Sequence, residues 1–303
     1  MSLRAIAIIL IWVGVLALLG VLVHRFTRGA WSLEDDDIPV ISPRQKLAAA
    51  WLWPPPPQGW GCSSGAGMEW DDDGIVLAVR RHGETGAVAS LLTRSHGRHA
   101  GLVHGGQGRT NRPILQPGNL VRAKWTGRLP EQLGNFKLEM LHAYGAAFLD
   151  DAARLSALGS ACALVETALA ERQPHPACHA ALVALLHALE AESWPSIYVH
   201  FELALLRDLG FGLDLSACAA TGQTDDLAWV SPKTGRAVSR AAGEPYRDKL
   251  FKLPAFLVEG GEGDAAAIRE GLEMTGFFLQ RHVLDSRHAV LPAARGRMIG
   301  RLG

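Results

Sequence analysis

The sequence has no excess of charge of either sign and no closely spaced pair of cysteines. Its 303 residues include 30 Lys and Arg against 30 Asp and Glu, so the net charge of the whole chain gives no information about a polyanionic partner. The four cysteines, Cys62, Cys162, Cys178 and Cys218, lie far apart and form no CxxC pair. This usage excludes a disulfide-rich scaffold and a zinc ribbon, and it is typical of a reducing compartment.

Motifs of common enzyme sites are missing as well. The chain has no HExxH, no nucleophile elbow and no Walker motif. The run Asp71-Asp72-Asp73 resembles a carboxylate cluster of a nuclease, but consecutive residues of a strand point to alternate faces, and we interpret the run as a solvated strand start. We therefore expect a protein that is not an enzyme. Metal-dependent cleavage of labelled DNA would separate a nuclease from a binding protein.

The first 67 residues differ from the rest. Ala5 to Val23 is an uncharged run flanked by Arg4 and by His24, Arg25 and Arg28, and as a helix it would cover about 28 Å, close to a bilayer core. Four consecutive prolines, Pro54 to Pro57, then predict an extended linker. Either the segment is a transmembrane anchor, or the gene start is placed too early and the protein begins at Met68. We favour the second interpretation, because residues 68–303 have the composition of a complete soluble protein.

Residues 68–146 have the pattern of a small β domain. Short apolar segments alternate with glycine and polar turns, and period-two alternation predicts that Val121, Ala123 and Trp125 face inward while Arg122 and Lys124 face outward. Five strands in about 75 residues fit a closed barrel of the OB type. The expected strands cover residues 74–81, 86–94, 98–104, 119–126 and 135–142.

Basic residues gather in this segment. Between Gly74 and Arg128 nine Lys or Arg face a single acid, Glu84, whereas Met68 to Gly303 as a whole is nearly neutral. The nine are Arg80, Arg81, Arg94, Arg98, Arg109, Arg112, Arg122, Lys124 and Arg128, and His82, His96, His99 and His104 add hydrogen-bond donors. Such a field on a small barrel is typical of phosphate-backbone binding, and we predict that the nine bind DNA. The alternative is a solvated basic face without a partner.

Two features of the barrel could contact nucleic acid. The loop 104–112, HGGQGRTNR, brings Arg109 and Arg112 together, but it lacks the Lys of a phosphate-binding P-loop. We expect a flexible basic loop that contacts DNA, although glycine could serve the turns of the connection alone. Trp125 could stack on a base, but its place in the alternation favours the core.

From residue 147 the apolar period changes to about 3.6, which predicts a helical domain over 147–303. Helices are expected at 148–158, 161–171, 177–192 and 195–209, and a last one follows the N-cap Asp264 with Ile268, Leu272, Leu279 and Val283 on one stripe. Residues 213–258 form an irregular insertion with a hairpin around Pro232 to Gly235. Its basic residues could extend a DNA path or belong to a solvated loop. The basic tail with Arg295, Arg297 and Arg301 is expected to be mobile.

Three stretches together resemble the RecO family of bacterial recombination and repair proteins. They are LLTRSHGRHAGLVHGGQGRTNRPILQPGNLV (91–121), FELALLRDLGFGLDLSACAATG (201–222) and FFLQRHVLDSRHAVLPAAR (277–295). Their order and spacing carry the resemblance, which covers Met68 to Gly303 and nothing before it. It implies an α+β architecture in which an OB barrel precedes a helical domain.

The resemblance also implies a function. Family members bind single- and double-stranded DNA, anneal complementary strands and help the partner RecR load the recombinase on gaps coated by single-stranded-DNA-binding protein, in the RecF pathway. The acidic, apolar tail of that protein would need an apolar groove with an Arg, and Arg154 and Arg207 on the helices are candidates, although ordinary surface charge is the simpler interpretation for both. Many members carry four cysteines as two CxxC pairs; here only Cys218 is present, so we expect no structural zinc and no other cofactor.

The resemblance places the protein in the cytoplasm, associated with the nucleoid, and a membrane anchor at Ala5–Val23 is the lesser alternative. A rival function from another class is a membrane-tethered adaptor whose OB barrel binds a partner protein. Fractionation of cells that express the gene would distinguish the two.

Overall fold

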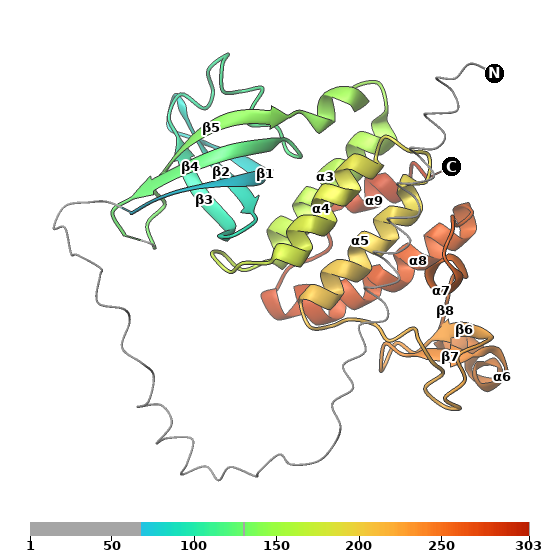
Figure 1. Cartoon of the computed structure of the whole chain (residues 1–303). Coiled ribbons are helices and arrows are strands. Elements are labelled where there is room, and N and C mark those ends of the chain that lie inside the picture. The colour runs from blue at the N-terminus through green and yellow to red at the C-terminus, as the bar shows by residue number, and fades with distance from the viewer. Residues whose placement is uncertain (1–67, 130, 303) are drawn as a thin grey trace, which may run out of the picture. The chain divides into compact units, whose positions relative to one another are not determined.

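The computed structural model describes residues 68–129 and 131–302. Five strands form a closed barrel in the order β1-β2-β3-β5-β4, the order of an OB fold (Figure 1). All neighbours are antiparallel except β3 and β5, which meet in parallel at Leu102 and Asn135. The strands are β1 (Met68–His82), β2 (Gly86–Thr93), β3 (Gly97–Val103), β4 (Leu120–Gly127) and β5 (Asn135–His142).

The barrel core follows the predicted alternation. Val121, Ala123 and Trp125 are at most 1% exposed, and Arg122 and Lys124 point the other way, which confirms both the inward and the outward assignments. Strand β1 is longer than predicted, because it begins at Met68 and pairs with β4 from its first residue. The acidic run 71–73 is therefore part of a paired strand.

Strand β1 supplies side chains to two cores. Val76 belongs to the barrel core, whereas Ile75 and Leu77 on its opposite face belong to the core of the helical domain, together with Leu92 of β2. Both faces of this strand are apolar because both are covered. The barrel therefore packs directly on the helices.

The helical domain begins with a short 3₁₀ turn, η1 (Tyr144–Phe148), followed by α3 (Ala152–Ala168), α4 (Pro176–Ala188) and α5 (Trp194–Asp208). The prediction of two helices at 148–158 and 161–171 was wrong, since α3 passes through Gly159 without a break. Ser160 is accommodated because its hydroxyl lies 2.7 Å from the Tyr198 hydroxyl in the core. Helix α5 ends at Asp208, just before the predicted stop at Gly210, which has a left-handed φ of +86°.

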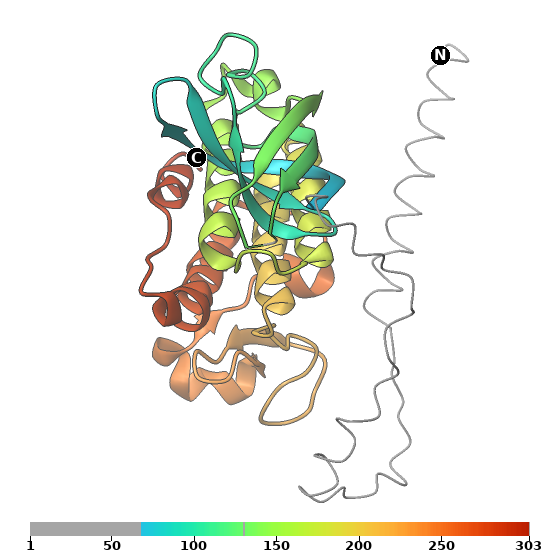
Figure 2. The same ribbon diagram turned by 90° about the vertical axis from the view of Figure 1, so that its left-hand side faces the viewer.

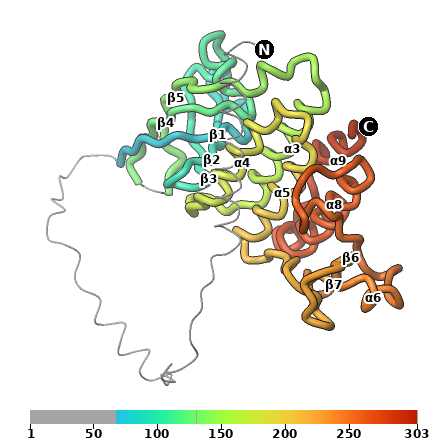
Figure 3. The backbone as a smooth tube through the Cα atoms, turned by 45° about the vertical axis from the view of Figure 1, so that its right-hand side comes forward, coloured from blue at the N-terminus to red at the C-terminus, as the bar shows by residue number. Residues whose placement is uncertain are grey.

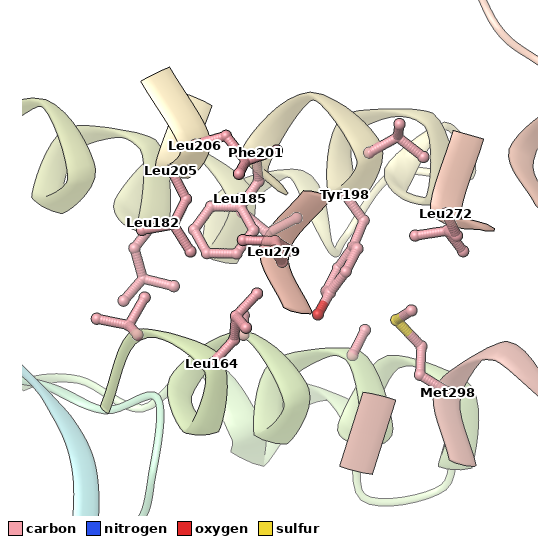
Figure 4. Close-up of a cluster of buried hydrophobic side chains, with 14 of the residues drawn as sticks. Leu164, Leu182, Leu185, Tyr198, Phe201, Leu205, Leu206, Leu272, Leu279 and Met298 are labelled. Carbon is pink, nitrogen blue, oxygen red and sulfur yellow. The ribbon is translucent and has the colours of Figure 1, made fainter. Parts of the chain in front are cut away.

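The core of this domain lies between α3, α4, α5 and the C-terminal helices. Figure 4 shows Leu164 of α3, Leu182 and Leu185 of α4, and Tyr198 of α5 pointing toward one another. All four are fully buried. Leu272, Leu279 and Met298 close the same cluster from the C-terminal part of the chain.

The insertion after α5 contains a three-stranded sheet in the order β7-β6-β8, formed by β6 (Leu227–Val230), β7 (Ala237–Ser239) and β8 (Phe251–Lys252). The hairpin predicted around Pro232 to Gly235 joins β6 and β7, and its turn closes with the Gly235 amide donating to the Ser231 carbonyl. The short α6 (Arg240–Gly243), η2 (Glu244–Lys249) and α7 (Phe256–Glu259) complete it. The sheet lies on the opposite side of the helices from the barrel (Figures 1 and 3).

The C-terminal part of the described chain is helical from Ala265 to Arg287 and again from Ala293 to Ile299. Asp264 caps α8 (Ala265–Phe278) by accepting a hydrogen bond from the Ala267 amide, and the predicted apolar stripe is buried. A π-helical turn η3 (Leu279–Leu284) and a 3₁₀ turn η4 (Asp285–Arg287) lead to α9 (Ala293–Ile299). The prediction of a mobile tail was wrong: α9 packs against α3 (Figure 2), and Arg295 is only 5% exposed.

Within residues 68–129 and 131–302 no helix has the length and apolarity needed to cross a membrane. The apolar run Ala5–Val23 and the proline-rich linker lie outside these residues.

Candidate nucleic-acid interface

Four of the nine predicted DNA-binding residues share one end of the barrel. Arg80 and Arg81 lie near the end of β1, next to its last residue His82, and Arg109 and Arg112 lie in the loop between β3 and β4. This loop is attached to the β1–β2 turn by Gln107, whose amide Nε2 donates to the carbonyls of Gly83 and Gly86 at 3.2 and 3.0 Å. We call these four residues the arginine cluster.

The loop is held in shape by its own hydrogen bonds. The Asn111 side chain donates to the carbonyls of His104 and Gly105, and the Arg112 amide donates to the Gly108 carbonyl at 3.0 Å. Leu115, farther along the same connection, is 4% exposed in the barrel core. The predicted flexible loop is therefore anchored at both ends to the barrel.

All four guanidinium groups of the arginine cluster are exposed, and none has an ion-pair partner among the residues that the structure describes. Arg94, in the turn between β2 and β3, and Arg128, directly after β4, are also exposed and have no ion-pair partner within residues 68–129 and 131–302. A guanidinium without a carboxylate partner can bind a phosphate without first breaking an ion pair. These six cations are therefore accessible to a phosphate.

Arg122 and Lys124 are paired with the acidic start of β1. The Arg122 guanidinium donates from Nε and Nη2 to the two carboxylate oxygens of Asp73 at 2.9 and 3.3 Å, and Lys124 pairs with Glu69. Hydrogen bonds to these carboxylates raise the pKa of both basic groups. The count of basic residues from Gly74 onward omitted these acids, and the interpretation of 71–73 as a solvated start missed their partners.

Asp72 points away from this pair. It accepts hydrogen bonds from the Ser95 amide at 2.7 Å and lies 3.2 Å from the His96 ring nitrogen. Asp72 and Asp73 thus engage different partners.

Arg98 joins the barrel to helix α3. Its Nε donates to the Leu169 carbonyl at 3.0 Å and its Nη1 to Glu166 at 3.1 Å, with Glu171 at 3.5 Å, and its side chain is only 15% exposed. A guanidinium held in this way is occupied by protein acceptors. The structure gives Arg98 a role between the domains, which sequence periodicity has no means to reveal.

The aromatic side chains divide between core and surface. Trp125 is buried, which confirms its assignment to the core, and its indole nitrogen donates to the Leu133 carbonyl. Trp70 of β1 is half-buried and stacks on His96 with ring centroids 4.0 Å apart. Sequence reasoning missed Trp70 because β1 was expected to begin later, and its position opposite Trp125 depends on the closure of the barrel.

Of the four histidines expected as donors, His82 and His104 are exposed, and His104 lies 2.9 Å from the Asn135 amide oxygen. His99 is 5% exposed inside the barrel and has no hydrogen-bond partner among the described residues. His99 therefore belongs to the core and not to a binding surface.

The basic residues of the insertion are mostly neutralised. Arg236, Arg240, Arg247 and Lys252 pair with Asp214, Asp226, Glu244 and Glu270, respectively. Lys233 and Lys249 have no ion-pair partner within the described residues. This arrangement favours a solvated face over an extended DNA path.

The two helical arginines considered for a partner tail differ. Arg154 pairs with Asp151 and Glu192 and donates to the Leu189 carbonyl at 2.7 Å. Arg207 is exposed near the end of α5, beside the segment of Phe211, which is 42% exposed. Only Arg207 keeps a guanidinium available for an incoming carboxylate.

The residues around Cys218 do not fit a structural zinc ion. Its sulfur hydrogen bonds to the amide and the hydroxyl of Ser239. Among the described residues no group of three or more His, Cys, Asp or Glu could hold a metal. His282, which could have helped, stacks between Phe211 and Phe278.

Two family models match this chain, one over the barrel and one over the helical domain. The family model described as Recombination protein O N terminal matches residues 68–144, and the model described as Recombination protein O C terminal matches residues 149–290. A DNA repair protein RecO of Rhodospirillum centenum is 58% identical over 236 residues, covering 77% of this chain and 94% of that protein. A second, of Phenylobacterium zucineum, is 52% identical over 240 residues, covering 78% of this chain and 98% of that protein. Both parts match in the order seen in the structure, and the chain therefore belongs to the RecO family of DNA repair and recombination proteins.

Proposed function

We propose that this protein binds single- and double-stranded DNA through the arginine cluster, anneals complementary strands, and helps RecR load the recombinase on gaps coated by single-stranded-DNA-binding protein. Family membership supports the role in repair and recombination and implies DNA as a partner. The observation that carries the more specific proposal is the set of four exposed, unpaired guanidinium groups at one end of the OB barrel.

Annealing requires two like-charged strands to approach each other. Arginines that contact phosphates release condensed counterions, so affinity falls linearly with the logarithm of salt concentration. A surface with several such contacts lowers the repulsion between the strands without reading their sequence. Trp70, stacked on His96 at the side of the barrel, could add a contact to an unpaired base.

The test is fluorescence anisotropy of labelled single-stranded DNA, titrated with the whole chain at several salt concentrations. Substitution of Arg80, Arg81, Arg109 and Arg112 by Ala is expected to lower the slope of log affinity against log salt by up to about 3, since each contact on a single strand contributes about 0.7. The control is Arg122→Ala, which removes a cation already paired with Asp73. An equal slope for wild type and the fourfold variant would refute the proposed surface.

The partner-binding part of the proposal has separate support. A tail that ends in apolar and acidic residues needs an apolar surface beside a free cation, and Arg207 with the exposed Phe211 supplies one. Arg207→Ala should weaken binding of a peptide of that tail at least several-fold. Lys233→Ala, an exposed cation of the insertion, serves as the control. Equal peptide affinity for both variants would remove Arg207 from the site.

We propose further that the protein is not an enzyme and acts in the cytoplasm near the nucleoid. Incubation of labelled DNA with the protein and divalent metal should leave the DNA intact. Fractionation of cells that express the untagged gene should place the protein in the soluble fraction. Recovery in the membrane pellet would instead support the membrane-tethered adaptor.

A further inference from the structure

The insertion sheet β6-β7-β8 is joined to a turn that contains Cys218. This turn closes on itself: the Cys218 amide donates to the Gln223 carbonyl at 2.7 Å, and the Gly222 amide donates to the Cys218 carbonyl at 2.9 Å. Gly222 has a φ of +74°, which a side chain would disfavour. The Ala219 amide then donates to the Ala237 carbonyl of β7 at 2.8 Å, so the turn lies against the sheet.

Two hydrogen bonds join the Cys218 sulfur to the end of β7. The Ser239 amide donates to Sγ at 3.2 Å, and the Cys218 thiol donates to the Ser239 hydroxyl at 3.4 Å. Cys218 is 1% exposed and Ser239 2%, so both bonds are buried, and they hold the turn against the sheet.

The spacing of these residues is that of two metal knuckles without their ligands. Cys218 and Thr221 are separated by two residues, and so are Ser239 and Ala242, the latter in α6 directly after β7. A tetrahedral zinc site in such a frame needs four sulfur or nitrogen ligands. At these four positions the chain offers one thiol, two hydroxyls and a methyl group, so the spacing of the frame is present and the ligand set is not.

We propose that the hydrogen bonds between the Cys218 sulfur and Ser239 close this insertion in the place where zinc would close a four-cysteine frame, so that the folded insertion needs no metal. Both partners are buried, so each bond is shielded from water and holds the Cys218 turn to the end of β7.

The first experiment measures metal content and hydrogen exchange on the whole chain. Elemental analysis should find no stoichiometric zinc, and a chelator should leave amide exchange in 214–243 unchanged. Cys218→Ala should accelerate exchange at the amides of Ala219, Gly222 and Ala237 roughly tenfold, the effect of losing buried hydrogen bonds that hold the turn to the sheet. Ser216→Ala is the control, because that hydroxyl bonds Asp214 and not the sulfur.

Cys218→Ser keeps a smaller acceptor and should give an intermediate acceleration. One zinc per chain, or exchange that accelerates on chelation, would overturn the proposal. So would exchange that Cys218→Ala leaves unchanged.

The second experiment rebuilds the ligand set. The combined substitutions Thr221→Cys, Ser239→Cys and Ala242→Cys should produce a chain that binds one zinc per molecule, measured by competition with a chromophoric chelator. Chelation of this variant should then accelerate exchange in 214–243, as it does not in the wild type. A folded variant that binds no zinc would show that these four positions do not form the frame.

Discussion

His99 is the residue whose environment departs most from the one that its sequence context indicates. It lies on β3 within a basic stretch, yet its ring packs edge-on against Trp70 and Trp125, 5.1 Å from each centroid. Burial, together with the positive charge of Arg172 and the neighbouring His96, lowers its pKa to about 4. The imidazole is therefore neutral in the folded barrel at physiological pH.

This shift makes the barrel sensitive to acid. The unfolded chain has an ordinary histidine pKa of 6.5, so between about pH 6.5 and 4 it binds a proton that the folded state does not. Stability should fall by about 1–2 kcal/mol from pH 7 to pH 5 through this group and be unaffected above pH 7. His99→Gln should remove that part of the loss, measured by urea unfolding at both pH values. His82→Gln, an exposed control, should leave it in place; equal pH dependence of wild type and His99→Gln would contradict the assignment.

At the scale of elements, the turn between β2 and β3 depends on Gly97. Gly97 has a φ of +67°, and a Cβ there would lie 1.9 Å from the Gln173 carbonyl oxygen, on the segment between α3 and α4. Gly83, in the turn between β1 and β2, has a similar φ of +61° but nothing within 4 Å of its Cβ position. Substitution of these two glycines therefore distinguishes the cost of a left-handed backbone, present at both positions, from the cost of a steric clash, present only at Gly97.

Gly83→Ala should therefore cost only the strain of a left-handed residue, about 1–2 kcal/mol. Gly97→Ala should cost clearly more, because the turn must also move away from the helical domain. Thermal or urea unfolding of both variants measures the difference. Equal losses of unfolding free energy in the two variants would mean that the segment around Gln173 moves aside at no energetic cost.

Helix α9 is held by a buried ion pair. The Arg295 guanidinium donates to the two carboxylate oxygens of Glu202 at 2.6 and 2.9 Å, with exposures of 5% and 0%, and Thr275 donates to the same carboxylate. Gly276 leaves room for this, since the Arg295 Nη1 lies 2.8 Å from its Cβ position. The tail read from sequence as a mobile basic cluster is thus attached through one of its own arginines.

Arg295→Ala should destabilise the helical domain by about 3–5 kcal/mol, because it leaves the Glu202 carboxylate buried and unpaired. Glu202→Leu combined with Arg295→Met should recover most of that loss, since an apolar pair carries no such penalty. Urea unfolding provides the measurement, with Arg297→Ala, an exposed residue of the same helix, as control. A loss below about 1 kcal/mol for Arg295→Ala would contradict the role of the pair.

At the scale of the whole molecule, the barrel and the helices share a core and a polar connection through Arg98. Arg98→Ala removes its bonds to Leu169 and Glu166, and it should destabilise the protein by about 2–3 kcal/mol, the range for hydrogen bonds to charged groups. It should leave the salt slope of DNA binding unchanged. Arg94→Ala, in the adjacent turn and exposed, should have the opposite pattern, with little loss of stability and a lower slope. A lower salt slope for Arg98→Ala without a loss of stability would instead show that Arg98 contacts DNA.

Local patterns predicted much of the architecture. The alternation of Val121, Ala123 and Trp125, the Asp264 cap, Gly210 after α5 and the hairpin in the insertion depend on residues close in sequence, and the structure confirms each of them. Such features are determined by the period of apolar side chains and by backbone preferences. The order of motifs also sufficed to indicate the family.

Tertiary structure alone decided which charges are free. Closure of the barrel places Glu69 opposite Lys124 and Asp73 opposite Arg122. Docking of α3 on the barrel places Glu166 beside Arg98. Folding of α9 onto the helical domain buries Arg295 against Glu202. Each pair joins residues about 50 to 90 positions apart, and their approach depends on register and packing that no local pattern contains. The sequence by itself thus determined a basic barrel followed by helices. The fold selected the arginine cluster from it, because only folding brings the neutralising carboxylates to the other cations.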